Sequence, residues 1–240
     1  QYTIKPVKLF MKVFFDYVIF THQSIGGVSN YIVNLVENFS DQVDPSIISL
    51  FYKNYYLKNS SFADKLFFYN RVGSMIKYIN KANKIYFNYK LKKEIPDIIH
   101  LTYFNEKNFY ASKAKKVITE YDLIKEKFYS EKHQDQIEYK KKLFEKVDQI
   151  ICISNNTKKD LQQEYSIDAS KISVVHLAVN KNKDFRDRFL NVRPFILYVG
   201  LRQRYKNFIN AIKAYARSSK LKLNFDFVCF GGGNFSKTEE

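Results

Sequence analysis

Short apolar runs alternate along this chain with longer segments of helical periodicity, and this alternation constrains the fold more than any other feature. It is typical of βαβ units built around a parallel sheet. Several runs are mostly Val, Ile and Phe, as expected of strands that are covered on both faces. The strands are expected at 12–16, 47–51, 98–100, 116–119, 149–153, 173–176, 195–200 and 225–230. The helices are expected at 29–39, 62–91 with a break near Gly73, 131–146, 157–165 and 206–217.

The same pattern divides the chain into domains. Residues 11–179 are expected to form a Rossmann-like α/β domain with a parallel sheet. The polar segment 180–194, which ends at Pro194, is the expected interdomain linker. Residues 195–240 supply two strands and one helix, and we expect them to begin a second Rossmann-like domain that is incomplete. Residues 1–10 precede Met11 and are left out of the fold expectation.

Two adjacent glycines, Gly26 and Gly27, stand between an apolar strand and an amphipathic helix. This order brings backbone N–H groups and the positive end of a helix against a phosphate. Glycine suits such a turn because it allows φ > 0 and has no Cβ to hold a ligand away. Any βα turn can contain two glycines, so the motif alone is compatible with both a phosphate site and an ordinary turn.

Five ordered blocks of sequence carry a resemblance to a known family. The blocks are Phe15–Phe20, Gly26–Tyr31, Asp97–Tyr103, Ile150–Asp160 and Ile196–Phe208. Together they resemble the family-4-type retaining glycosyltransferases, from about Met11 to the last residue, with departures at Tyr17, Val18 and Asn30. The resemblance implies the two-domain GT-B fold and transfer of a sugar from a nucleotide-sugar donor, with retention, to a glycan or lipid-linked acceptor. It implies that the donor is a substrate, with no cofactor and no metal ion at its phosphates.

Arg202 and Lys206 are the residues that the resemblance assigns to the donor's phosphates. A leaving nucleoside diphosphate gains negative charge as the glycosidic bond breaks, and two fixed cations stabilise that charge most in the transition state. Gly231 and Gly232 follow the next strand and would let the nucleotide approach the backbone. The structural alternatives are surface cations in a lysine-rich chain and a flexible glycine turn.

Tyr121 and Asp122 are the catalytic residues that the resemblance suggests. The block Thr119–Ile124 is similar to the family's Thr-Val-His-Asp-Met-Ile, whose His lies beside the transferred sugar. Tyr121 can donate a hydrogen bond to a sugar hydroxyl, but it cannot act as a cation near neutral pH. Asp122 either orients neighbouring side chains or starts the next helix. Tyr121 is equally compatible with an ordinary loop residue in a chain with 19 tyrosines.

The chain has a formal net charge of +16, which raises the question of anionic partners. Its lysines are scattered and accompany no RNP-like motif or zinc knuckle, so nucleic-acid binding is not expected. Peripheral contact with the inner face of a membrane, by a cytoplasmic protein, is an additional expectation. No apolar run approaches the length of a membrane-spanning helix, which disfavours a span or a signal peptide.

Cys152 and Cys229 lie within apolar runs, and we interpret both as small buried side chains in a reducing compartment. The four histidines show no ligand spacing, so no metal site is expected. The family's acidic motif, two Glu separated by seven residues, would lie further along than Glu239 and Glu240. Residues 1–240 alone are therefore not expected to complete a donor site or to transfer sugar.

Two other functions remain open on the sequence. One is a catalytically inactive or truncated relative that binds a glycan or a partner protein, which the substitution at Tyr121 favours. The other is a basic Rossmann-like nucleic-acid-binding protein, which the scattered lysines do not favour. Binding of nucleoside diphosphates, nucleotide sugars or oligonucleotides distinguishes the three.

Overall fold

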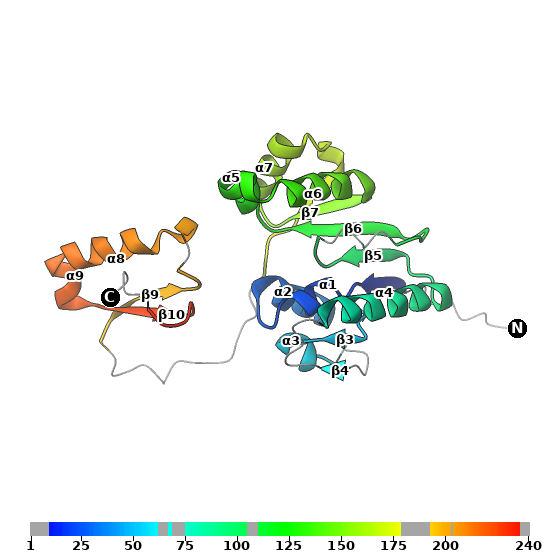
Figure 1. Cartoon of the computed structure of the whole chain (residues 1–240), viewed down its shortest axis with the longest axis horizontal. Coiled ribbons are helices and arrows are strands. Elements are labelled where there is room, and N and C mark those ends of the chain that lie inside the picture. The colour runs from blue at the N-terminus through cyan, green and yellow to red at the C-terminus, as the bar shows by residue number, and fades with distance from the viewer. Residues whose placement is uncertain are drawn as a thin grey trace, which may run out of the picture. The chain divides into compact units, whose positions relative to one another are not determined.

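The computed structural model describes residues 10–61, 67–68, 75–104, 110–178, 193–202 and 204–235. The chain divides into two compact units, Gln1–Ala178 and Val179–Glu240, and each is described by itself (Figure 1). Most of the predicted linker, and the predicted helix break near Gly73, lie outside the described residues. Among the residues that are described, no helix is long and apolar enough to cross a membrane.

The first unit is built on a six-stranded sheet in which every neighbouring pair is parallel. The strand order is β2-β1-β5-β6-β7-β8. The strands are β1 Met11–Phe15, β2 Val43–Ile47, β5 Ile98–Leu101, β6 Lys115–Glu120, β7 Gln149–Cys152 and β8 Ile172–Val174. The order reverses at β1, so the switch point at which ligands bind in such sheets lies between β1 and β5. The edge strand β2 contains Pro45, which lies opposite Val13.

Helices cover both faces of this sheet. They are α1 Val18–His22, α2 Gly27–Glu37, α3 Tyr55–Lys58, α4 Ile76–Lys93, α5 Ile124–Tyr129, α6 Gln134–Lys146 and α7 Asn155–Tyr165, with 3₁₀ turns η1 Ser130–Lys132 and η2 Ala169–Lys171. Successive side chains of a strand point to opposite faces. Val13 and Phe15 of β1 belong to one buried cluster with Ile32 of α2, and Phe14 belongs to another with Phe87 of α4. The predicted α/β fold of this unit is confirmed.

The second unit contains two parallel strands, β9 Phe195–Val199 and β10 Asp226–Phe230. Between them lie η3 Arg204–Lys206, α8 Phe208–Arg217 and α9 Ser219–Asn224. Phe208 of α8 is buried against the rings of Tyr198 and Phe227. The other face of the two strands is apolar and 40% to 71% exposed, at Phe195, Leu197, Val199, Val228 and Phe230.

Two expectations about local structure are wrong. The predicted strand 47–51 is divided, because β2 ends at Ile47 and a separate pair of short strands follows, β3 Phe51–Tyr52 and β4 Phe67–Phe68. The backbone N–H groups of Leu50 and Phe51 donate to Asn83 Oδ1 of α4, which diverts this segment from the main sheet. Phe67 and Phe68 are therefore strand residues, although they fall within the predicted helix 62–91.

Helix α1 was not expected, because the predicted first strand ends at residue 16 and a loop was expected between it and Gly26. Asp16 Oδ1 accepts a hydrogen bond from the N–H of Val18 at 3.2 Å, and Thr102 Oγ1 accepts one from Ile19 at 3.1 Å. These two acceptors satisfy N–H groups at the start of the helix that have no intrahelical partner. The helix thus depends on Thr102, which lies just beyond β5 in the chain.

Candidate functional site

The Gly26–Gly27 turn leads directly into α2, as predicted. Gly26 is the N-cap residue, and its carbonyl accepts hydrogen bonds from Asn30 N and Ser29 Oγ, both at 3.0 Å. The side chain of Gln23 folds back over this turn, and its Oε1 accepts from Ser29 N at 3.3 Å. A side-chain oxygen therefore lies at the positive end of the helix, where a phosphate oxygen is expected to bind.

The conformational reason given above for these glycines is wrong. Gly26 has φ −179°, which is extended backbone open to any residue, and Gly27 is not among the glycines with positive φ. A Cβ on Gly26 would lie 2.3 Å from Gln23 Oε1, whereas a Cβ on Gly27 would meet nothing within 4 Å. Gly26 therefore makes room for the Gln23 side chain.

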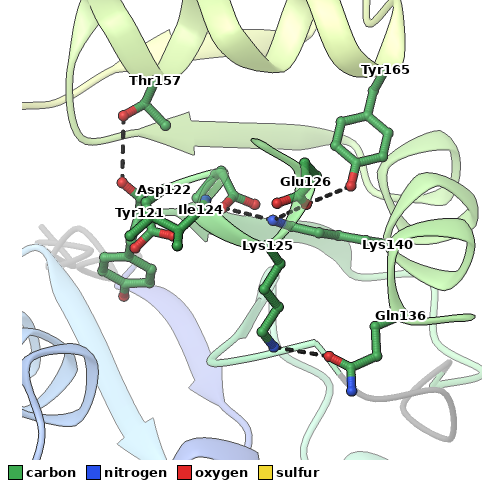
Figure 2. Close-up of polar contacts among 10 residues, drawn as sticks. Tyr121, Asp122, Ile124, Lys125, Glu126, Gln136, Lys140, Thr157 and Tyr165 are labelled. Carbon is green, nitrogen blue, oxygen red and sulfur yellow. Dashed lines mark hydrogen bonds and ion pairs between the residues drawn. The ribbon is translucent and has the colours of Figure 1, made fainter. Parts of the chain in front are cut away.

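Tyr121 lies against α2, the helix that begins at Gly27. Its ring packs edge-on against that of Tyr31, with the centroids 5.6 Å apart. Its hydroxyl is buried and has no hydrogen-bond partner among the described residues, and burial raises the Tyr121 pKa well above its usual value. The Tyr121 carbonyl accepts from Thr157 Oγ1 of α7 at 3.4 Å (Figure 2). Tyr121 therefore lies beside the helix that begins at the Gly26–Gly27 turn, so two predicted parts of the site belong to the same region of the first unit.

Asp122 is exposed and starts the next helix. Its Oδ1 accepts a hydrogen bond from Ile124 N, at the first residue of α5, at 3.1 Å. This is one of the two roles that the sequence suggested for Asp122. Its catalytic role stays a prediction.

Beneath this turn lies a buried ionic cluster that the sequence analysis did not identify. Lys140 of α6 donates to Glu120 Oε1 at 3.0 Å and to Glu126 Oε1 at 2.8 Å. Tyr165 of α7 donates to the same Glu126 oxygen at 2.6 Å, and the ammonium group lies 4.6 Å from the centroid of the Phe104 ring. Figure 2 shows the Lys140 side chain reaching toward Glu126 and Tyr165. The cluster thus ties β6, α5, α6 and α7 together next to Tyr121.

The charges in this cluster do not balance, because two carboxylates share one lysine. The Oε2 atoms of Glu120 and Glu126 are buried with no partner among the described residues. Burial raises the pKa of Glu120 to about 7, against the lowering effect of Lys140. Burial also acts to raise the Glu126 pKa, but Lys140 and the Tyr165 hydroxyl outweigh it, so that pKa falls below its usual value. Glu120 is therefore the member of the cluster that takes up a proton near neutrality.

In the second unit, Arg202 and the glycine turn after β10 form one assembly. Arg202 Nη1 donates to the Gly231 carbonyl at 3.0 Å, and Nη2 donates to Gly233 and Asn234 at 3.1 and 2.7 Å. The guanidinium also lies 4.5 Å from the Phe235 ring centroid. Gly231, Gly232 and Gly233 have φ of 87°, 84° and 73°, a conformation that other residues rarely adopt. Arg202 thus holds this turn, and its predicted contact with phosphates stays a prediction.

Lys206 is exposed at the end of η3, with its ammonium group 5.2 Å from the Tyr205 ring centroid. Its predicted role at the donor's phosphates stays a prediction. Cys152 is buried as expected, but Cys229 is only half-buried, and neither forms a disulfide with another described residue. Across the described ranges, no group of three or more His, Cys, Asp or Glu side chains is arranged to hold a metal ion.

Comparison with known proteins connects this site to one family. Residues 25–183 match the sequence model of the family described as Glycosyltransferase Family 4. The match takes in well over half of the 240 residues and includes Gly26, Gly27, Tyr121 and Asp122. Comparison with curated proteins gave no match.

Two solved structures are similar to the chain over most of its length. The lipopolysaccharide outer core galactosyltransferase WaaB, in its apo form, is 19% identical with a TM-score of 0.50, over 92% of this chain and 68% of its own. HepE from Anabaena, solved in complex with UDP, is 11% identical with a TM-score of 0.57, over 91% of this chain and 69% of its own. At these identities the likeness concerns the fold, and it confirms the predicted Rossmann-like architecture of the GT-B type.

Proposed function

The chain belongs to glycosyltransferase family 4, and we propose that the whole protein transfers a sugar from a nucleotide-sugar donor, with retention, to a glycan or lipid-linked acceptor. The family match over residues 25–183 carries this proposal, because it includes both Gly26–Gly27 and Tyr121–Asp122. HepE was solved with UDP, which makes UDP the first nucleotide to test here. The donor acts as a substrate, and we propose neither a cofactor nor a metal ion.

The second unit supplies the contact to the diphosphate in this proposal. Arg202 and Lys206 stabilise the charge that develops on the leaving group, and the turn at Gly231–Gly232 gives it room to approach the backbone. The hydrogen bonds from Arg202 to Gly231 and Gly233 support this role, because they fix the guanidinium beside the turn. A phosphate that binds there shares or replaces some of these hydrogen bonds.

The first unit supplies the contact to the sugar. The Tyr121 hydroxyl is buried with no partner among the residues that the structure describes, and leaving such a group unpaired costs free energy. A sugar hydroxyl that reaches it would satisfy it, as donor or acceptor. Asp122 and Ile124 hold the turn in place at the start of α5. In this proposal Tyr121 occupies the place of the family's histidine without its positive charge.

An inactive relative that binds a glycan is the second candidate, and the tyrosine at position 121 is the observation that favours it. In both cases we propose a cytoplasmic protein that makes peripheral contact with the inner face of a membrane. Nucleic acid is not a proposed partner. The two candidates differ in nucleotide binding, which only the transferase requires.

Titration calorimetry with UDP, UDP-sugars, an oligosaccharide and a short oligonucleotide tests the proposal. We expect UDP to bind and Arg202→Ala to weaken it about 10- to 100-fold, the range for a hydrogen bond to a charged group. Arg193→Ala is the matched control, because Arg193 pairs with Asp226 at the opposite ends of the same two strands. Absence of UDP binding with glycan binding retained would favour the inactive relative. Oligonucleotide binding without UDP binding would exclude both.

A further inference from the structure

Helix α4 carries a row of exposed apolar and aromatic side chains along its outer side. Tyr78, Ile85 and Tyr89 are 73%, 62% and 49% exposed. Their spacing of seven and four residues places all three within about 40° around the axis of a helix with 3.6 residues per turn. Met75 and Ile95, which lie just before and just after the helix, are also exposed. The exposed apolar side chains therefore extend beyond both ends of the helix.

The opposite side of α4 is anchored in the first unit, which fixes the direction of this row. Phe87 is fully buried, and its ring packs against Phe14 of β1 and Tyr110. Asn83 is also fully buried, with its amide accepting from Leu50 N and Phe51 N and donating to the Phe51 carbonyl at 2.9 Å. If α4 rotated to bury the outer row against the first unit, the contacts of Phe87 and Asn83 would break, so the row stays on the outside.

The charges on α4 are of one sign. Within the helix there are six lysines and no Asp or Glu, the lysines being Lys77, Lys81, Lys84, Lys90, Lys92 and Lys93. By the same helical geometry, Lys81 and Lys92 flank the row on one side and Lys93 flanks it on the other. Glu94, which follows the helix, pairs with Lys90 at 2.8 Å. The outer face thus has an apolar centre with lysines along both margins.

We propose that this outer face of α4 binds the surface of an anionic lipid bilayer, with the helix axis in the plane of the membrane. Tyr78, Ile85 and Tyr89 would enter the interface between headgroups and acyl chains, where aromatic rings are favoured. Lys81 and Lys92 would remain at the level of the anionic headgroups.

A bilayer matches this face better than other anionic partners do. A bilayer can bind the lysines and the apolar row together, since its anionic headgroups pair with lysines and its acyl region accepts the exposed aliphatic side chain of Ile85. A nucleic acid would pair with the lysines and stack on the tyrosines, but it offers no apolar phase to Ile85. The α4 face therefore favours lipid over nucleic acid.

This inference rests on the proposed function only in that a lipid-linked acceptor gives the enzyme a reason to bind a membrane. Its test measures vesicle binding and needs no donor or acceptor. UDP binding of each variant is measured in parallel, so that failure of the membrane surface and failure of the donor site are distinguished.

The test is co-sedimentation of the chain with vesicles of phosphatidylcholine, with or without phosphatidylglycerol. We expect binding to the anionic vesicles only, weaker at high salt because the lysine contribution is screened. A double variant, Lys81→Gln with Lys92→Gln, should bind about 25-fold more weakly, at about fivefold for each lysine near the surface. A triple variant, Tyr78→Ser, Ile85→Ser and Tyr89→Ser, should lose at least tenfold. All five side chains are exposed, so thermal unfolding of both variants should match the parent chain.

Two matched controls make the result specific to α4. Lys141→Gln with Lys142→Gln removes the same charge from exposed positions of α6, and Leu197→Ser with Val199→Ser removes apolar side chains from the exposed face of β9. Both controls should bind vesicles as the parent chain does. The proposal fails if the α6 pair weakens binding as much as Lys81 and Lys92. It also fails if the β9 pair abolishes binding, if phosphatidylcholine alone binds equally well, or if the chain binds an oligonucleotide and no vesicle.

Discussion

The ammonium group of Lys140 lies 3.0 Å from the carboxylate of Glu120, the residue immediately before Tyr121 in the chain. Both side chains are buried, so each depends on the other for compensation of its charge. The pair connects the last residue of β6 to α6, across 20 residues of sequence. Stability of the first unit and position of the Tyr121 turn are therefore linked.

Lys140→Met should destabilise the first unit by about 3–5 kcal/mol, because it leaves two carboxylates buried without a cation. Addition of Glu120→Gln to that variant should recover part of the loss, since it removes one of the stranded charges. Urea unfolding of the single and double variants measures both effects. If the two substitutions are simply additive, the ion pair contributes nothing as a pair.

Glu120→Gln alone should change how stability depends on pH. With its pKa raised to about 7 from 4.5, native Glu120 holds a proton that the unfolded chain has lost. The stability from that proton is fully present below pH 4.5 and is lost as the pH rises to about 7. The free energy of unfolding of the variant, relative to the parent, should therefore increase with pH across this window. A difference that is constant with pH would exclude titration of Glu120.

His100 should contribute stability to the first unit at high pH, whereas Glu120 contributes it at low pH. It is buried on β5, with its ring stacked on Phe15 and its Nε2 3.0 Å from Thr119 Oγ1. Burial lowers its pKa from 6.5 to about 4, so the stability from neutral His100 is present above pH 6.5 and is lost as the pH falls to about 4. In His100→Gln, the free energy of unfolding should fall less as the pH drops below 6.5, by up to about 3 kcal/mol. Denaturant titrations across this pH range, compared with the parent chain, measure the change.

Tyr121→Phe should separate a role in binding from a role in packing. The hydroxyl is buried with no partner among the described residues, so its removal should leave stability unchanged or raise it by up to about 3 kcal/mol. If the hydroxyl contacts the donor sugar, the variant should bind a UDP-sugar up to about tenfold more weakly and UDP itself unchanged. Calorimetry with both ligands gives the comparison. Equal affinity of the variant and the parent for the UDP-sugar would remove Tyr121 from the sugar site.

Gly232→Ala should disturb the contact between Arg202 and the glycine turn. The new Cβ would lie 2.9 Å from Arg202 Nη1, at a backbone φ of 84°. Gly233→Ala is the control, because its φ of 73° carries a similar backbone cost of about 1–2 kcal/mol but its Cβ would meet nothing within 4 Å. Both variants should lower the stability of the second unit, but Gly232→Ala should weaken UDP binding more. Equal UDP affinities would separate the Arg202 contact from the donor site.

The sequence was a good guide where structure depends on local pattern. Apart from β2, the strands of the parallel sheet and the helices α2, α6 and α7 follow from apolar runs and helical spacing, within a few residues of their ends. It failed where a distant side chain decides the local structure. Thr102 stabilises the start of α1, and Asn83 turns the chain away from the sheet at Leu50. Neither effect is visible in the segment that it changes.

Some residues of the candidate site could be predicted from the sequence and others could not. Gly26, Tyr121 and Arg202 stand out because they follow strands and belong to recognisable blocks. The cluster of Glu120, Lys140 and Glu126 was missed because its members are separated by 14 and 20 residues. One signal was available: Glu120 places a charge at the end of an apolar strand, and a buried charge needs a partner. The reason for a glycine at position 26 was misjudged because it is the space that the Gln23 side chain occupies, which the local sequence does not reveal.

Pro45 limits the pairing of strands between two molecules of this protein. It lies in β2, at one edge of the large sheet, and an imino acid has no N–H to donate to a further strand. A strand of a neighbouring molecule that paired with β2 would therefore lack a hydrogen bond near the middle of the ladder, at Pro45. Fibril-like stacking through this edge of the first unit is therefore disfavoured at the level of the backbone, whatever the side chains around it.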